Sequence, residues 1–191
     1  MKKRTILISL LSVFITLFFC GSKTVSAAEK TYDIGTDVTF APFEFQNDDN
    51  EYEGIDIDIL NAIAEDQGFK INLRPLGFDS SVQGVQSNQL DGMIAGMSIT
   101  EEREQSFDFS DPYYDSGIQM AVAQGNDEIK SYKDLEGKTV GAKVGTESAD
   151  FLEDNKDKYN FDVKNYDDAS GLYGAVDNNT VEAIFDDFPV L

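Results

Sequence analysis

The chain has 191 residues, of which 36 are acidic, 15 are basic and none is histidine, and its formal net charge is −21 at pH 7. This charge repels nucleic acid and anionic membrane surfaces, so neither is expected as a partner. The lack of histidine removes imidazole-based catalysis and imidazole zinc sites. The acidic turn at 49–54 lacks the glutamate that a calcium loop needs at its twelfth position, where Leu60 stands. The sequence therefore predicts no catalytic residue, no metal site and no cofactor.

Residues 1–28 have the features of a secretory signal peptide. Basic residues at positions 2–4 precede an apolar run over 6–19, and small residues close the segment. The run is too short to cross a membrane comfortably. The single cysteine, Cys20, follows the bulky Phe19, which disfavours lipid attachment there. We therefore predict an exported, extracytoplasmic protein that is stable without disulfides.

From residue 31 onward, short strands alternate with amphipathic helices, which predicts an α/β fold with a largely parallel sheet. The elements expected in the first half are a strand at 32–35, a helix between Gly54 and Gly68, a strand at 69–74 that Pro75 ends, a helix capped by Asp79 or Ser80 that reaches about Asn88, a buried strand at 93–97 and a helix capped by Thr100.

The chain changes character at 112–117, which predicts a crossover between two lobes. The elements expected after it are a strand at 118–123, a short helix at about 132–135, a strand at 139–143, a helix from about Ser148, a strand at 161–163, and a last helix and strand that end at Phe185. We expect residues 29–115 to form the N-terminal part of lobe I and 116–191 an incomplete lobe II. No later element returns to the first sheet, so the sequence is expected to be a fragment of a longer product.

The turn at 96–100 has the features of an anion site. It follows a predicted strand and precedes a predicted helix, so free backbone N–H groups point outward. Arg103, in the first helical turn, supplies a planar donor pair that matches a carboxylate. The alternative is that Arg103 pairs with Glu101 or Glu104 on a surface helix, and the chemistry of these residues alone does not separate the two.

A similar turn, at 144–148, links a strand to a helix in the second lobe. Two segments thus each offer an anion site, which favours a ligand held between them. Phe40 and Phe78 each follow a strand and lie at its carboxyl end, where open α/β sheets bind ligands. Taken alone, each fits the core better than a binding site, because aromatic side chains are mostly buried for packing.

Six sequence blocks carry a resemblance to a known family. In order they are GTDVTFAPFEF, YEGIDIDILNAIAEDQG, MIAGMSITEERE, FDFSDPYY, DLEGKTVGAKVGT and EAIFDDFPVL. Together they resemble the solute-binding proteins of bacterial polar amino-acid ABC importers, nearest the glutamine-binding branch, and they span essentially the whole chain after the leader. The resemblance implies a two-lobed type II periplasmic-binding-protein fold. It also implies a monomeric receptor, not an enzyme, that passes a small-molecule amino acid to a membrane permease.

The resemblance also implies which residues contact the amino acid. The arginine of the T-x-x-R turn, here Arg103, clamps the α-carboxylate with help from backbone N–H groups near Gly96, Ser98 and Thr146. The acidic residue before the F-P step, here Asp187, binds the α-ammonium group.

The remaining positions implied by the resemblance surround the side chain of the ligand. Phe40 and Phe78 match the aromatic pair that sandwiches its aliphatic part, and Asp37 and Lys143 match the positions at its far end. A cationic Lys143 repels lysine or arginine ligands and an anionic Asp37 repels a second carboxylate, so a neutral amide fits and glutamine is favoured. Glu147 departs from the pattern, because the glutamine-binding branch has a glycine there, and its carboxylate can narrow or redirect the site.

Two other functions remain open on the sequence alone. The same fold serves in sensor domains of signalling receptors, which would continue into a signalling segment after Leu191. It also serves in dehydratase-type enzymes, in which a pocket carboxylate would turn over a bound acid. The sequence also leaves open whether the receptor is free, lipid-anchored or fused to its permease.

Overall fold

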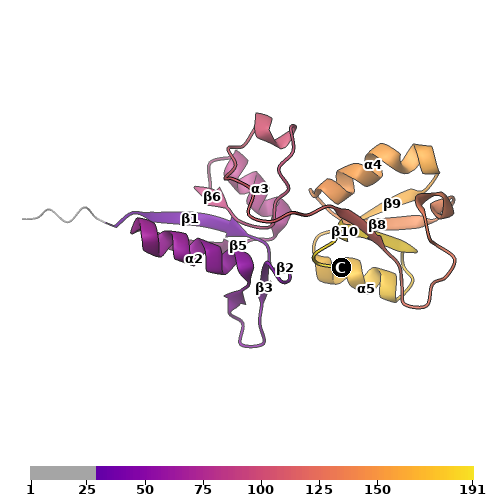
Figure 1. Cartoon of the computed structure of the whole chain (residues 1–191), viewed down its shortest axis with the longest axis horizontal. Helices are drawn as coiled ribbons and strands as arrows, with labels where there is room; N and C mark the ends of the chain where they lie inside the picture. Colours follow the sequence, from indigo (N-terminus) through magenta and orange to yellow (C-terminus); the bar gives the residue numbers. More distant parts are fainter. Residues whose placement is uncertain (1–28) are drawn as a thin grey trace, which may run out of the picture.

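The computed structural model describes residues 29–191, in which two sheet-based lobes follow one another along the chain (Figure 1). The predicted signal peptide at 1–28 lies outside the described residues. Among residues 29–191, no helix combines the length and the apolar character needed to cross a bilayer.

Lobe I is built on a parallel sheet with the strand order β5-β1-β6. Its strands are β1 (Thr31–Thr36), β5 (Lys70–Pro75) and β6 (Gly92–Met93), connected through helices α2 (Ile55–Gln67) and α3 (Phe78–Gln86). A small antiparallel sheet between β1 and α2 consists of β2 (Thr39–Phe40), β3 (Glu44–Gln46) and β4 (Tyr52–Glu53).

Helix α2 begins and ends where the sequence predicts. Gly68 follows its last residue with a φ of 69°, and its N–H donates to Ala64 O, which closes the helix in the left-handed conformation that glycine favours. Gly35 in β1 allows close packing against α3 and the loop after it, because a Cβ there would lie 2.7 Å from Leu90 Cδ1.

Three expectations for lobe I are wrong in detail. Helix α3 starts at Phe78 after Gly77 and has no side-chain cap, so Asp79 and Ser80 lie inside it. Strand β6 covers only Gly92–Met93, since its pairing with β1 ends at Met93. The helix expected after Thr100 is the single 3₁₀ turn η1 (Arg103–Gln105).

Lobe II is built on a sheet with the order β7-β10-β8-β9. Its strands are β7 (Ile118–Ala121), β8 (Thr139–Lys143), β9 (Asp162–Tyr166) and β10 (Ala183–Asp187), and its helices are η2 (Tyr132–Leu135), α4 (Glu147–Tyr159) and α5 (Ala169–Asp177). Strand β10 pairs parallel with β8 and antiparallel with β7.

Both faces of the lobe II sheet are covered by helices, α4 on one side and α5 on the other (Figure 1). Successive residues of β10 point to opposite faces. Phe185 packs with Leu152 of α4, and Ile184 packs with Leu172 of α5. A strand that is buried on both faces carries apolar residues at consecutive positions. This explains why apolar and polar residues do not alternate along β10.

The two lobes are joined by residues 106–117, which form no helix or strand, and they also touch directly. Lys143 of β8 forms an ion pair with Asp37, which follows β1. Arg103 Nη2 donates to Gly145 O at 3.0 Å, and Ala169 N donates to Thr39 Oγ1 at 3.1 Å. The two-lobed α/β architecture that the resemblance implies is thus the one observed.

Candidate functional site

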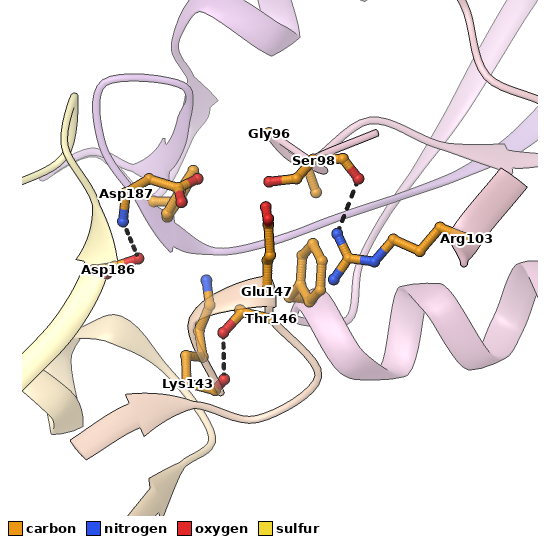
Figure 2. A pocket seen from close by; sticks show the side chains of 11 residues that line it. Gly96, Ser98, Arg103, Lys143, Thr146, Glu147, Asp186 and Asp187 are labelled. Carbon is orange, nitrogen blue, oxygen red and sulfur yellow. Dashed lines mark hydrogen bonds between the residues drawn. The ribbon is translucent and has the colours of Figure 1, made fainter. Parts of the chain in front are cut away.

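A pocket lies between the two lobes, at the carboxyl ends of their parallel strands (Figure 2). Lobe I lines it with Phe40, Phe78, Ala95, Gly96, Ser98 and Arg103, and lobe II with Lys143, Thr146, Glu147, Asp186 and Asp187. Eight of the nine predicted site residues are in this lining. The ninth, Asp37, lies behind it and is fully buried.

Arg103 enters the pocket from η1 and contacts both lobes. Its Nη1 donates to Ser98 O at 3.0 Å, while its Nη2 donates to Gly145 O at 3.0 Å. The guanidinium also lies over the ring of Phe78, 5.8 Å from its centroid. Neither Glu101 nor Glu104 forms an ion pair with it among the described residues, so the surface-pair alternative is not what the structure has.

The anion site of lobe I differs from the one expected from its sequence. Thr100 Oγ1 accepts from Arg103 N at 3.2 Å, as a cap would, but only one 3₁₀ turn follows. The Gly96 N–H donates to Asp56 Oδ2 at 2.8 Å, so it is not free for a carboxylate. Arg103 is therefore the main positive group on this side of the pocket.

The turn of lobe II does lead into a full helix. Thr146 is the N-cap of α4: its Oγ1 accepts from Ala149 N at 3.3 Å and donates to Lys143 O at 2.7 Å. Gly145 supports the turn with a φ of 74°, a conformation that favours glycine. The N-terminal end of α4, with its partial positive charge, thus faces the pocket.

Asp37 and Lys143, the two positions that the resemblance implies for the far end of the ligand, face each other in the structure. Both side chains are almost completely buried, and they form an ion pair across the lobes. The ammonium group lies 4.5 Å from the ring centroid of Phe40 and 5.5 Å from that of Phe78. The sequence could not show this, because the partners are 106 positions apart.

A second group of carboxylates lies at the end of β10. Asp186 accepts a hydrogen bond from the Tyr173 hydroxyl at 2.8 Å, and burial raises its pKa. Burial, followed by the charges of Asp186 and Glu147, raises the pKa of Asp187 to about 6. Asp186 is a pocket residue that sequence reasoning missed, although it stands next to the predicted Asp187 in the FDDFP block.

Glu147 points into the pocket from the first residue of α4 (Figure 2). The sequence marked it as a departure from the family pattern, and the structure brings it close enough to Asp187 for its charge to raise that pKa. Carboxylates from α4 and β10 therefore share one side of the pocket, with Arg103 on the other.

The pocket is small in the present arrangement of the lobes. Its cavity volume is about 20 Å³. Because a cavity needs about 10–15 Å³ to hold one water molecule, this pocket has room for little more than one water. An amino acid can enter only when the lobes move apart.

Known proteins with the same architecture bind amino acids. The sequence profile of the bacterial extracellular solute-binding proteins, family 3, matches residues 32–187. The L-cystine-binding protein TcyJ of Escherichia coli K12 is 34% identical over 155 residues, which are 81% of this chain and 58% of TcyJ. The chain thus spans less than two thirds of the length of this relative.

Two solved structures differ in how well the whole chain superposes. An ancestral arginine-binding protein bound to arginine is 38% identical with a TM-score of 0.81, over 86% of this chain and 73% of that one. The second substrate-binding domain of Lactococcus lactis GlnP, in an open conformation, is 48% identical, yet its TM-score is 0.53 over 86% of this chain and 71% of that one. The chain thus superposes better on the arginine-bound protein than on the open GlnP domain, although its sequence is more similar to the latter.

Proposed function

The chain belongs to the bacterial extracellular solute-binding proteins of family 3, and on this basis we propose that it binds a polar amino acid between its lobes, with glutamine favoured. The observation that carries the proposal is the separation of charge in the pocket. Arg103 supplies positive charge from lobe I, and Asp187 and Glu147 supply negative charge from lobe II opposite it, where the first N–H groups of α4 add hydrogen-bond donors. A zwitterion with its two charged groups on one carbon matches this pattern.

Each part of the amino acid has a proposed partner. Its α-carboxylate would replace Gly145 O as the partner of the Arg103 guanidinium and approach the first N–H groups of α4. Its α-ammonium group would bind Asp187. Its aliphatic carbons would lie between Phe40 and Phe78, as the resemblance implies.

The far end of the ligand would meet the Asp37–Lys143 ion pair. Because the two charges neutralise each other, this end of the pocket favours a neutral group that can both donate and accept. A side-chain amide does both, which supports glutamine over glutamate or arginine. A binding function without catalysis is supported by the names of the relatives, which are binding proteins.

The proposed physiological setting follows from the family. We propose that residues 1–28 direct export, that lobe I (29–115) and lobe II (116–191) close as a monomeric receptor, and that the loaded receptor delivers its amino acid to the membrane permease of an ABC importer. Ligand-bridged closure would present both lobes together to the permease, because the bound amino acid stabilises the closed arrangement.

Calorimetric titration with glutamine, glutamate, asparagine, arginine, histidine and cystine tests the proposal. We expect glutamine to bind, and we expect Arg103→Ala to weaken binding at least about 100-fold, because hydrogen bonds between charged groups contribute about 1.5–3 kcal/mol each. Arg74→Ala is the matched control, since Arg74 is an exposed arginine of lobe I that pairs with Asp33 away from the pocket.

The outcomes separate the parts of the proposal. Binding of arginine or cystine in place of glutamine would overturn the amide preference and keep the receptor function. If none of these amino acids produces a heat of binding, the receptor function is overturned. Equal affinity in Arg103→Ala and Arg74→Ala would overturn the carboxylate clamp.

A further inference from the structure

Two buried carboxyl groups lie behind the pocket in lobe I. Glu44 of β3 and Asp56 of α2 are both fully buried. Both oxygens of Glu44 and Oδ1 of Asp56 are without a hydrogen-bond partner among the described residues. Unpaired buried carboxylate oxygens are costly, so this cluster needs an explanation.

A proton shared between Glu44 and Asp56 accounts for Asp56 Oδ1 and one oxygen of Glu44. Two carboxylates in contact in a buried site cannot both be ionised at low cost. Burial, and next the charge of Asp56, raise the pKa of Glu44 to about 11. Glu44 is then protonated at neutral pH and can donate a hydrogen bond to Asp56. The other charged groups that act on it are Asp37, which raises its pKa further, and Lys143, which lowers it.

The second oxygen of Asp56 connects two functional segments. Asp56 Oδ2 accepts from the Gly96 N–H at 2.8 Å and from the Tyr113 hydroxyl at 3.0 Å. Gly96 lines the pocket, and Tyr113 lies in the connection that leads to β7 in lobe II.

The position of Gly96 leaves little freedom for this contact to shift. Its φ is 53°, and a Cβ there would lie 2.6 Å from the Phe40 ring. The ring of a proposed ligand-binding residue therefore packs directly on this peptide. A displacement of the peptide would change the wall that the ligand meets.

We propose that Asp56 is a positioning residue that holds the Gly96 peptide in its binding position and links it to the interlobe connection through Tyr113, with protonated Glu44 as the partner that orients Asp56. The inference rests on the proposed amino-acid binding, since its main consequence is for affinity. Asp56 Oδ2 accepts two hydrogen bonds, and in this proposal Oδ1 accepts a third, from the proton on Glu44. An asparagine at this position has one accepting oxygen, so it cannot serve all three donors.

Four variants test the proposal by glutamine titration. We expect Asp56→Asn to weaken binding more than about tenfold and Tyr113→Phe about fivefold, in line with the loss of hydrogen bonds to a charged acceptor. Glu44→Gln should bind within about twofold of the unchanged protein, because an amide N–H replaces the carboxyl proton. Tyr114→Phe is the matched control, since its ring packs on Phe43 and its hydroxyl forms no hydrogen bond among the described residues.

Amide hydrogen exchange at Gly96, measured without added amino acid, provides a readout that does not depend on binding. We expect faster exchange at Gly96 in Asp56→Asn and Tyr113→Phe than in Tyr114→Phe. The two tyrosine variants should have equal urea unfolding midpoints, so that the faster exchange reflects the local hydrogen bond and not global stability. If the unchanged protein binds no amino acid, the proposed function fails while this exchange still tests Asp56. Unchanged exchange and affinity in Tyr113→Phe would overturn the link to the connection, and a Glu44→Gln variant as impaired as Asp56→Asn would overturn the proton on Glu44.

Discussion

In the proposed site, Asp187 and Glu147 show how single residues would control when the pocket accepts an ammonium group. Burial and neighbouring negative charges raise the pKa of Asp187 to about 6, so it prefers to be protonated in mildly acidic solution. An ammonium ligand reverses this preference, because an opposite charge stabilises the carboxylate. If Asp187 binds the ammonium group as proposed, ligand binding and proton release from Asp187 are coupled.

We expect glutamine affinity to rise as the pH increases through about 6. Without amino acid, the free energy of unfolding should fall as the pH rises from about 4 to 6. Over this range the folded state retains the proton on Asp187, whereas the unfolded state releases it. Glu147→Gln removes one repelling charge and should move the affinity midpoint to lower pH. Titration between pH 5 and 8 checks this.

The exposed Glu153 of α4 provides the control for this experiment. Glu153 pairs with Lys156 and does not line the pocket, so Glu153→Gln should keep the midpoint of the unchanged protein. An affinity that is constant between pH 5 and 7 would contradict the assignment of Asp187 to the ammonium group.

At the scale of elements, α4 is both part of the lobe II fold and a wall of the pocket. Its N-cap, Thr146, connects the last residue of β8 to the first turn of the helix through both of its hydroxyl hydrogen bonds. The same turn carries Glu147 into the pocket. Helix capping and the shape of the pocket wall therefore depend on one side chain.

Thr146→Ala should lower the free energy of unfolding by about 1 kcal/mol, the usual cost of losing an N-cap, and should also weaken glutamine binding. The control is Asp168→Ala, because Asp168 caps α5 in the same lobe, accepts from Gly171 N at 2.7 Å and lies outside the pocket. Urea unfolding and calorimetry of both variants would separate the effects. A similar loss of affinity in both variants would show that Thr146 acts through stability alone.

The elements also show what the sequence could and could not predict. The hydrophobic spacing and the two glycines around α2 predicted its bounds, because these signals are local. The cap at Thr100 predicted a helix where one turn forms, since a cap marks where a helix can begin and not how long it continues. The Asp37–Lys143 pairing and the partner of the Gly96 N–H depend on the packing of distant segments, which local patterns do not encode.

For the whole molecule, the contacts between the lobes include one buried ion pair. A buried lysine that loses its carboxylate normally costs about 3–5 kcal/mol. The partner of Lys143 belongs to the other lobe, so if the lobes part, as proposed, the ammonium group can reach water and avoid much of this cost. The cost of breaking this pair should therefore appear as opening of the molecule.

We expect Asp37→Asn to increase the radius of gyration in small-angle X-ray scattering while the free energy of unfolding falls by less than about 3 kcal/mol, the usual lower cost of an unpaired buried charge. Asp33→Asn is the control, since the Asp33–Arg74 pair is exposed and lies within lobe I. A full loss of stability in Asp37→Asn, with no change in radius, would show that the lobes do not part.

The volume of the pocket also determines the timing of capture. A space that holds little more than one water cannot receive an amino acid by direct diffusion from the closed arrangement. In the proposed receptor, entry would wait for the lobes to separate, so at high amino-acid concentration the rate of capture would be limited by the hinge motion of the protein and not by collision. Such a receptor reaches a ceiling in its sampling rate that richer surroundings cannot raise.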